Sequence, residues 1–377
     1  MKIQSIILAA GLLLACAGCS KDEGGLSVKD LPDGKLTISV KASGLGAKTY
    51  SDGEENLTLE GEMNINNLAV VVFDETGTLL LGAPVWQEAS LLDGVATLTD
   101  VPVKATNARI TILSNTPRGA FDDVTSFSDF QSRLAQLSAQ SQSNLTMSTW
   151  VVTTKEPLSE GDNYLGYASM GDANVNGIAE PVELTRIASR VDVLSMETDF
   201  AGTKLEGRRV RVDEVYIADR KTASRYFSED YWDVVMAEAH FDDGGAFPVG
   251  GVISDGNKIA DTGFKQYVME NDASEKPTRL IVKATLLASG NYAEQTRLFA
   301  ATINANGLSK GYNHNFIKRN YVYLLHVTFG GDSFENIDNP PTPPDPPTPP
   351  DPPVENLLDV QVEVVGWGPV DQPVEIE

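Results

Sequence analysis

The sequence predicts an all-β fold, and three observations support that prediction. Short apolar segments recur along the 377 residues, with turn signals between them. Several of these segments alternate apolar with polar residues, which is the period of a half-buried strand. The apolar fraction is 41% and the charged fraction 22%, so the chain can form cores for two domains of ordinary size. We place the boundary near Thr185, between domains 35–184 and 185–377.

The first predicted strand covers residues 35–42, with the sequence KLTISVKA. Its apolar residues alternate with polar ones and therefore share one face: Leu36, Ile38, Val40 and Ala42. We expect this face to pack in a core. Thr37, Ser39 and Lys41 fall on the opposite face.

Later segments continue the pattern in both halves. Turn residues follow two of them, in DETG at 74–77 and SNTP at 114–117. The further predicted strands are 68–73, 109–113, 187–194, 210–217, 279–287, 296–303 and 321–329. One helix is predicted in the first domain, because apolar residues recur at three- and four-residue spacing behind the candidate capping residues Ser126 and Ser128. Its predicted apolar face is Phe127, Phe130, Leu134 and Leu137.

The chain is strongly acidic, with 53 Asp and Glu against 29 Lys and Arg, a net charge of −24. Such a surface repels phosphate backbones and anionic lipid headgroups, which argues against nucleic acid as a partner. The acidic residues are spread along the chain, as expected of a solubilising surface.

Residues 1–18 have the features of an export signal: a basic Lys2, an apolar run too short to span a membrane, and small residues before a cysteine. This start resembles a bacterial lipoprotein signal, with Cys19 as the lipidated residue and 19–34 as a polar tether. A frame ending at Cys16 and a plain secreted protein are the alternatives. The residues SKDEGG after Cys19 resemble the surface-export tag of Bacteroidetes lipoproteins, which implies an outer-membrane lipoprotein at the cell surface. Both cysteines lie in this start, so we expect no disulfide in the folded part.

Residues 172–183 fit the calcium-loop pattern of an EF-hand, with oxygen ligands at alternate positions and Glu183 at the end. No amphipathic helix precedes the pattern and Pro181 lies inside it, so we interpret it as a hairpin turn, with calcium binding as the alternative. The histidines fit neither a metal-ligand spacing nor a nucleophile motif: His240, His314 and His326. The sequence therefore predicts no catalytic residue, no metal site, no cofactor and no enzyme activity, and His326 is interpreted as structural.

Proline dominates residues 340–353, which are predicted to form a polyproline II rod of roughly 43 Å at about 3.1 Å per residue. The segment 356–377 follows, and its apolar residues again alternate with polar ones: Leu358, Val360, Val362 and Val364. This stripe is chemically interchangeable with that of the first strand. Val374 and Ile376 could form one more strand.

Several segments, in this order, resemble the fimbrillins, the pilin subunits of Bacteroidales fimbriae known as type V pili. They are the lipoprotein start, LTISV followed by GLGAKT, LAVVVFDETGTLL, ARITILSNT, TRIASRVDV and VQVEVVGWGPVDQPVEIE. The resemblance spans most of the chain. It implies two tandem transthyretin-like β-sandwiches with Greek-key strand order, made as a lipidated precursor.

The resemblance also implies how such subunits assemble. A trypsin-like protease cuts the precursor after its first strand, and loss of that strand bares a groove that a terminal segment of another subunit fills. The family's processing site usually ends in arginine, but the first arginine here is Arg109, so Lys48 is our candidate site. Segment 356–377 is the candidate donor, with pairing inside its own domain as the alternative. Such exchange satisfies exposed strand edges by β-augmentation.

We therefore expect a structural subunit of a cell-surface fimbria that supports adhesion. Its expected partners are other copies of itself or related fimbrial subunits, and a ligand on a host or bacterial surface. A stalk position is the first interpretation, because the chain has both a removable strand and a candidate donor, and a tip or anchor position is the alternative. A surface glycan-binding lipoprotein is the alternative from another class. It would need a platform of aromatic side chains, and the tryptophans are scattered: Trp86, Trp150, Trp232 and Trp367.

Overall fold

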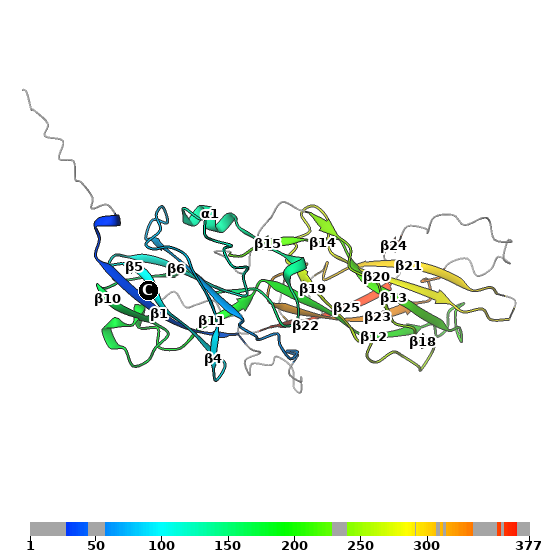
Figure 1. The fold of residues 1–377 in the computed structure, drawn as a ribbon. Helices are drawn as coiled ribbons and strands as arrows, with labels where there is room; N and C mark the ends of the chain where they lie inside the picture. The colour runs from blue at the N-terminus through cyan, green and yellow to red at the C-terminus, as the bar shows by residue number, and fades with distance from the viewer. Residues whose placement is uncertain are drawn as a thin grey trace, which may run out of the picture.

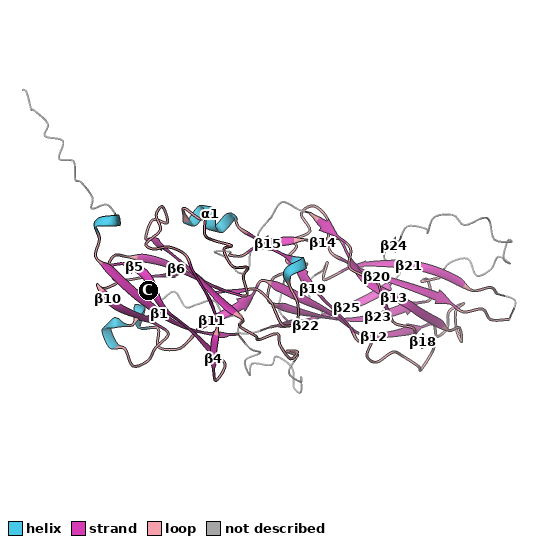
Figure 2. Ribbon diagram, in the orientation of Figure 1, coloured by secondary structure: helices cyan, strands magenta, loops and turns pink. Residues whose placement is uncertain are grey.

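The computed structural model describes residues 28–43, 57–227, 240–290, 292–306, 310–311, 314–334, 353–355 and 358–367. The two halves of the chain lie end to end in an elongated molecule, with the first half at the left of Figure 1. Strands dominate both halves, and the one α-helix of the described residues is short (Figure 2). The prediction of a mostly β protein with a short helix in its first half is confirmed.

The first half contains one ten-stranded sheet with the main order β3-β2-β6-β8-β11-β1-β5-β4, to which β10 and β9 add at β1 and β6. The sheet folds over itself, because the inner faces of β2 and β6 share one core with those of β1 and β5. Its strands are β1 (Asp33–Ala42), β2 (Asn67–Asp74), β3 (Val85–Glu88), β4 (Ser90–Leu92), β5 (Val95–Lys104), β6 (Ala108–Ser114), β8 (Met147–Ser148), β9 (Val152–Thr153), β10 (Gly161–Leu165) and β11 (Val182–Arg186).

The second half contains two sheets that share one core, with orders β19-β12-β23-β25-β22 and β17-β13-β20-β21-β24, and β18 pairs with β13. Their strands are β12 (Ala188–Asp199), β13 (Val210–Ala218), β17 (Phe247–Pro248), β18 (Val252–Ile253), β19 (Phe264–Met269), β20 (Arg279–Leu286), β21 (Gln295–Thr302), β22 (Lys310–Gly311), β23 (Tyr321–Gly330), β24 (Val354–Glu355) and β25 (Leu358–Gly366). Transthyretin-like topology and Greek-key order remain predictions.

Helix α1 (Phe127–Ser132) is shorter than its apolar spacing predicts. The N-cap is right, since the backbone N–H of Asp129 donates to Ser126 Oγ at 3.1 Å. The continuation through Leu134 and Leu137 is wrong. Leu134 begins β7 (Leu134–Gln136), which pairs with β15 (Ala223–Arg225) of the second half, and Leu137 begins the 3₁₀ turn η2 (Leu137–Ala139). A long-range ladder thus takes precedence over helical periodicity.

The two halves are joined by a shared apolar cluster as well as by the β7–β15 ladder. Tyr226 and Phe227, which follow β15, reach the first half and pack on the aromatic side chains of α1 and its surroundings. Tyr226 meets Phe121 edge-on at 5.2 Å between centroids, and Phe227 lies 5.7 Å from Phe127. The smaller elements are η1 (Val28–Asp30), η3 (Gly171–Ala173), η4 (Val175–Gly177), β14 (Arg220–Lys221) and β16 (Phe241–Asp242).

Candidate functional site

Strand β1 lies between two neighbours and is hydrogen-bonded along both edges. It pairs antiparallel with β5 on one edge, and on the other edge it pairs in parallel with β10 and then with β11. The predicted inward face is buried, with exposed fractions of 0%, 0%, 0% and 7% for Leu36, Ile38, Val40 and Ala42. Removing β1 would therefore open an apolar groove with two unpaired edges, which we call the β1 groove.

One residue of β1 differs from the prediction. Ser39 was expected on the outer face, but it is buried, whereas Thr37 and Lys41 are half-buried. Gly166, at the end of β10, lies so close that a Cβ added there would be 2.7 Å from the carbonyl oxygen of Ser39. The residue after β10 thus approaches the backbone of β1 closely at this point, which strand periodicity does not predict.

A cluster of charged and aromatic side chains lies where the two halves meet, and we call it the junction cluster: Glu62, Arg186, Arg190, Tyr267 and Trp367. Arg190 donates Nη1 to both carboxylate oxygens of Glu62, at 2.7 and 2.8 Å. The Tyr267 hydroxyl and Trp367 Nε1 also donate to Glu62, at 2.7 and 3.2 Å. Four of these side chains are at most 1% exposed, and Tyr267 is half-buried.

Arg186 links the end of β1 to the end of β25. Its Nη1 donates to the backbone oxygen of Ser43 at 2.9 Å and to that of Trp367 at 2.8 Å, and its Nε donates to the backbone oxygen of Glu62 at 3.0 Å. Its guanidinium lies 4.7 Å from the centroid of the Trp367 ring. Burial lowers the pKa of Arg186 to about 10, so this side chain stays charged at neutral pH.

Arg190 completes the charge balance of the junction. Asp192 accepts from its Nε and Nη2 at 2.8 and 2.9 Å, as a carboxylate that faces the guanidinium fork. Burial disfavours the charge on Arg190, but its bonds to Asp192 and Glu62 outweigh burial and raise its pKa. Two arginines and two carboxylates thus neutralise one another in a site that excludes water.

The predicted processing site lies between two residues that this cluster holds. Arg186 binds the backbone oxygen of Ser43, and Arg190 Nη2 binds that of Leu57 at 2.8 Å. Lys48 lies between them in the sequence, in 44–56, which is outside the described residues. Cys19, the signal 1–18 and most of the proline segment 340–353 are also outside the described residues. Cleavage at Lys48 and lipidation of Cys19 remain predictions.

The predicted donor segment lies in its own domain in this structure. β25 pairs antiparallel with β23 along its whole length, from Leu358 opposite Phe329 to Gly366 opposite Tyr321. Val362 and Val364 are buried, while Leu358 and Val360 pack against the same core from its rim. Pairing within the domain, an alternative that the sequence leaves open, is thus the observed arrangement. Donation to a neighbour remains a prediction.

The EF-hand-like motif forms two 3₁₀ turns, and its amide side chains bond to the backbone. Asn176 accepts from the N–H of Lys155 and donates to the oxygen of Thr153, at 2.8 and 2.7 Å. Asn174 donates to the oxygen of Ile178 at 2.8 Å. Glu183, the predicted closing ligand, lies in β11 with its carboxylate 3.4 Å from the Lys41 ammonium. These contacts favour the interpretation as a structural turn.

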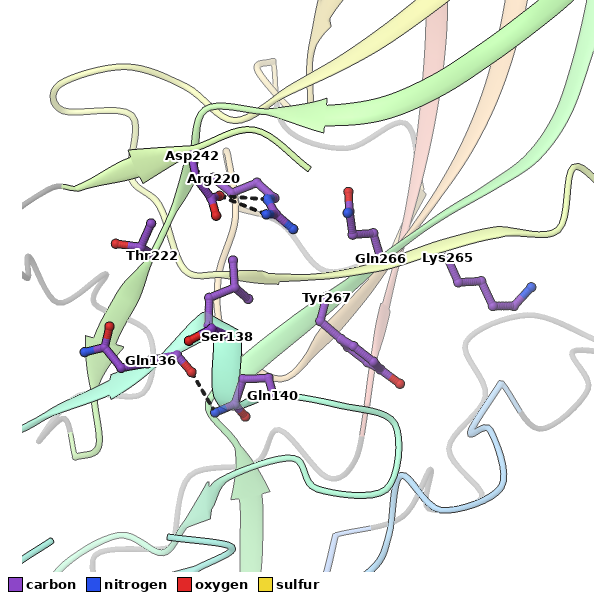
Figure 3. A pocket seen from close by; sticks show the side chains of 10 residues that line it. Gln136, Ser138, Gln140, Arg220, Thr222, Asp242, Lys265, Gln266 and Tyr267 are labelled. Atoms are coloured by element: carbon purple, nitrogen blue, oxygen red, sulfur yellow. Dashed lines mark hydrogen bonds and ion pairs between the residues drawn. The ribbon is translucent and has the colours of Figure 1, made fainter. Parts of the chain in front are cut away.

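A pocket of about 460 Å³ lies beside the junction and is lined from both halves (Figure 3). Arg220 and Asp242 form an ion pair at 2.9 Å on one wall, and Gln140 donates to the Gln136 backbone oxygen at 3.2 Å on the other. Among the described residues, no group of three or more His, Cys, Asp or Glu side chains could hold a metal ion. The polar side chains Arg220, Asp242 and Gln140 in the pocket walls thus bond to other groups of the protein itself.

The histidines have structural contacts. His326 Nδ1 lies 2.8 Å from Ser195 Oγ, between β23 and β12. His314 Nε2 lies 2.7 Å from the Tyr323 hydroxyl, and its ring packs 4.5 Å from that of Tyr321. Burial, with a smaller contribution from the charge of Lys318, lowers the pKa of His314 to about 4.

We predict that His314 makes the fold acid-sensitive. Its pKa is depressed in the folded state relative to an unfolded value of about 6.5, so the unfolded chain takes up the proton first. The stability that neutral His314 contributes to the folded state is fully present above pH 6.5 and is lost as the pH falls towards 4. Thermal unfolding from pH 7 to 4 should show a shallower fall for His314→Gln than for the wild type. The same change at exposed His240 should leave the wild-type slope, and equal slopes for all three proteins would contradict the assignment.

The comparisons with known proteins cover both halves of the chain. Residues 35–186 match the family model of the major fimbrial subunit protein FimA, and residues 187–367 match that of the C-terminal domain of fimbrium tip subunits like Fim1C. A protein of Parabacteroides distasonis ATCC 8503 named as a candidate fimbrium tip subunit, Fim1C, is 49% identical over 383 residues, 99% of each chain. The chain belongs to the fimbrillin family.

Solved structures show the same fold for this fimbrillin. A crystal structure of a candidate cell adhesion protein from Parabacteroides distasonis ATCC 8503 is 48% identical, with a TM-score of 0.79 over 90% of this chain and 98% of that one. A fimbrilin, FimA, from Porphyromonas gingivalis W83 has a TM-score of 0.60 at 20% identity over 90% of this chain and 99% of that one. Because the chain belongs to this family, it is a non-enzymatic fimbrial subunit of the cell surface that associates with other fimbrial subunits. Among its described residues, no helix is long and apolar enough to cross a membrane.

Proposed function

We propose that this fimbrillin is the tip subunit of its fimbria, which receives a strand from the next subunit and keeps its own C-terminal strand. The observation that carries this proposal is the pairing of β25 within its own sheet, with Trp367 buried in the junction cluster. The similarity to Fim1C, including the tip-type C-terminal domain model, supports the same position. A terminal subunit of a head-to-tail fibre needs only one of the two complementary surfaces. The tip alternative is therefore better supported than the stalk position first inferred from the sequence.

The receiving surface of this proposal is the β1 groove. Loss of β1 uncovers apolar slots and the edges of β5, β10 and β11, and an incoming strand restores both the apolar contacts and the ladders. Each fully buried aliphatic anchor contributes about 1.5 to 3 kcal/mol before ordering and association costs. Cleavage at Lys48 would make β1 removable, and the lipid on Cys19 would hold the precursor at the outer membrane until then.

Donation of β25 would require disrupting a packed domain. The strand would have to leave the β23 ladder, withdraw Val362 and Val364 from the core, and release Trp367 from Arg186 and Glu62. A released Trp367 would also leave a buried carboxylate and two guanidinium groups with fewer partners, which is costly in a low dielectric. These costs favour retention of the strand. The adhesive role expected for a tip would then belong to surfaces that assembly leaves free.

The position can be tested by tagging the protein in the exposed turn 255–258 of the second half and locating the tag on isolated fimbriae with gold-labelled antibody. A tip subunit should give a single gold particle at one fibre end. In solution, the cut protein alone should stay monomeric and should form a one-to-one complex with a fimbrial subunit that has a free donor strand. Gold at regular intervals along the fibre, or ladders formed by the cut protein alone, would establish a stalk subunit instead.

A further inference from the structure

The β1 groove is closed to a side chain at its start. Gly34 lies two residues before the first apolar anchor, and a Cβ added to it would be 2.6 Å from the backbone oxygen of Ser159 and 3.3 Å from Val103 Cγ2. Carbon atoms do not approach backbone oxygen that closely without displacement, so this position accepts only glycine. Glycine within a strand commonly marks such a close approach of two backbones.

The obstructing oxygen is fixed in place. Asn163 Nδ2 donates to the Ser159 oxygen at 3.0 Å, and its Oδ1 accepts from the Ser159 N–H at 2.8 Å. The same amide donates to the Lys35 backbone oxygen in β1 at 3.1 Å. Asn163 is only 4% exposed, so the loop and the strand are bound to one buried amide. A Cβ at position 34 therefore cannot be accommodated by movement of a flexible side chain.

Beyond this point the accepted side chains are large at first and become smaller towards the end of the strand. The buried residues after Gly34 are, at alternate positions, Leu36, Ile38, Val40 and Ala42. Near the middle, the missing side chain of Gly166 lets the β10 end approach the Ser39 oxygen, and Gly166 has a φ of +89°, where a side chain would be strained. The groove thus fixes both the register and the direction of a strand that fills it.

We propose that the β1 groove selects a strand of a different fimbrial subunit that has glycine two residues before its first apolar anchor, in the order Gly-x-Leu-x-Ile-x-Val-x-Ala, and that runs in the direction of β1. The inference rests on the proposed function and names its partner by chemistry. By the same rule the chain should not add to itself, because its own C-terminal segment fits poorly.

The misfit of the chain's own segment follows from its sequence. With Leu358 aligned to Leu36, Asn356 falls at the position of Gly34. Shifting the segment by two residues in one direction puts Leu358 at the position of Gly34. Shifting it by two residues in the other direction puts Asn356 in the first apolar slot. In the reverse direction Gly366 meets the glycine position, but Leu358 then replaces Ala42. A shift by one residue turns every anchor to the wrong face.

The test uses the full chain with a site for a sequence-specific protease introduced within 44–56, so that cutting leaves β1 in place but exchangeable. Labelled peptides then compete with β1, and their incorporation is measured by fluorescence anisotropy. The peptides are 33–43, 33–43 with Gly34→Ala, 33–43 with Lys35→Ala, and 356–366. Lys35 is the matched control because its side chain is exposed and pairs only at the surface with Asp100.

We expect the Gly34→Ala peptide and peptide 356–366 to bind at least about tenfold more weakly than 33–43, and the Lys35→Ala peptide to stay within about twofold. Equal binding of Gly34→Ala, or of 356–366, would overturn the selection rule while leaving strand replacement intact. Failure of 33–43 itself to enter would overturn the receiving function as well. As a second measurement, Gly34→Ala in the uncut chain should lower the melting temperature more than Lys35→Ala does, and equal melting temperatures would also count against the rule.

Discussion

Replacing Glu62 with glutamine is expected to lower the free energy of unfolding by about 3–5 kcal/mol, the cost of removing one partner from a buried ion pair. Glu62 is fully buried and accepts bonds from Arg190, Tyr267 and Trp367, together with the backbone N–H of Leu59. Glutamine keeps the size of the side chain but not its charge. Asp192 would then be the remaining carboxylate of the cluster for the two guanidinium groups. Urea unfolding at neutral pH measures the change.

A matched control is available two residues away. Glu60 is exposed, so Glu60→Gln removes the same charge from the same turn without touching the junction cluster, and it should change stability by less than about 0.5 kcal/mol. A similar small effect of Glu62→Gln would mean that the buried charge is not needed. Because both halves contribute to the cluster, we also expect the two halves of the Glu62→Gln variant to unfold at separate denaturant concentrations.

Strand β1 could be predicted from the sequence because its alternation alone identifies the buried face. Leu36, Ile38 and Val40 are all 0% exposed, as period-two reasoning requires. The neighbours of β1 could not be predicted in the same way. Asn163 bonds to the Lys35 backbone oxygen across 128 residues of chain, and Gly166, directly after β10, closely approaches the backbone oxygen of Ser39. Side-chain alternation along a strand contains no information about which distant segment pairs with it.

The junction cluster was missed for a related reason. Arg186 and Arg190 lie in TRIASRVDV, a segment noted only for its resemblance to the fimbrillins. Two arginines in an otherwise apolar strand region are a signal of buried pairing, since a buried guanidinium needs a partner. Asp192 lies in the same segment, but the other partners are Glu62 from the first half and Trp367, directly after the last described strand. Only the folded chain brings these segments together.

The C-terminal segment shows where identical patterns stop being informative. The apolar stripe of this segment resembles that of β1: Leu358, Val360, Val362 and Val364. Its pattern fits equally well a strand that inserts into a neighbouring subunit and a strand that pairs within its own domain. The difference lies in Trp367, the next large residue after the stripe. Its ring stacks on Tyr267 at 5.9 Å, with 11° between planes, and its oxygen binds Arg186. In this structure a residue outside the repeating pattern thus anchors the strand in its own domain.

We therefore predict that Trp367→Ala destabilises the protein by about 3–5 kcal/mol, as expected for a large aromatic side chain truncated in a core. The ring is 0% exposed, lies 4.7 and 5.3 Å from the guanidinium groups of Arg186 and Arg190, and donates Nε1 to Glu62. The loss should appear first in β25. Hydrogen exchange of its backbone amides should accelerate more than that of β13 or β20, which belong to the opposite sheet of the same core.

Trp367→Phe separates packing from hydrogen bonding at this site. Phenylalanine keeps an aromatic face over the arginines but cannot donate to Glu62, so a loss of about 1–3 kcal/mol is expected for the lost hydrogen bond and the smaller ring. If Trp367 retains β25 in its own domain, Trp367→Ala should also make the segment available to a neighbouring subunit. The released segment of cut Trp367→Ala protein should then pair with a peptide that has the sequence of β23. Wild-type protein should not bind this peptide. Unchanged amide exchange in β25, despite a lowered stability, would show that the ladder with β23 suffices to retain the strand without its terminal tryptophan.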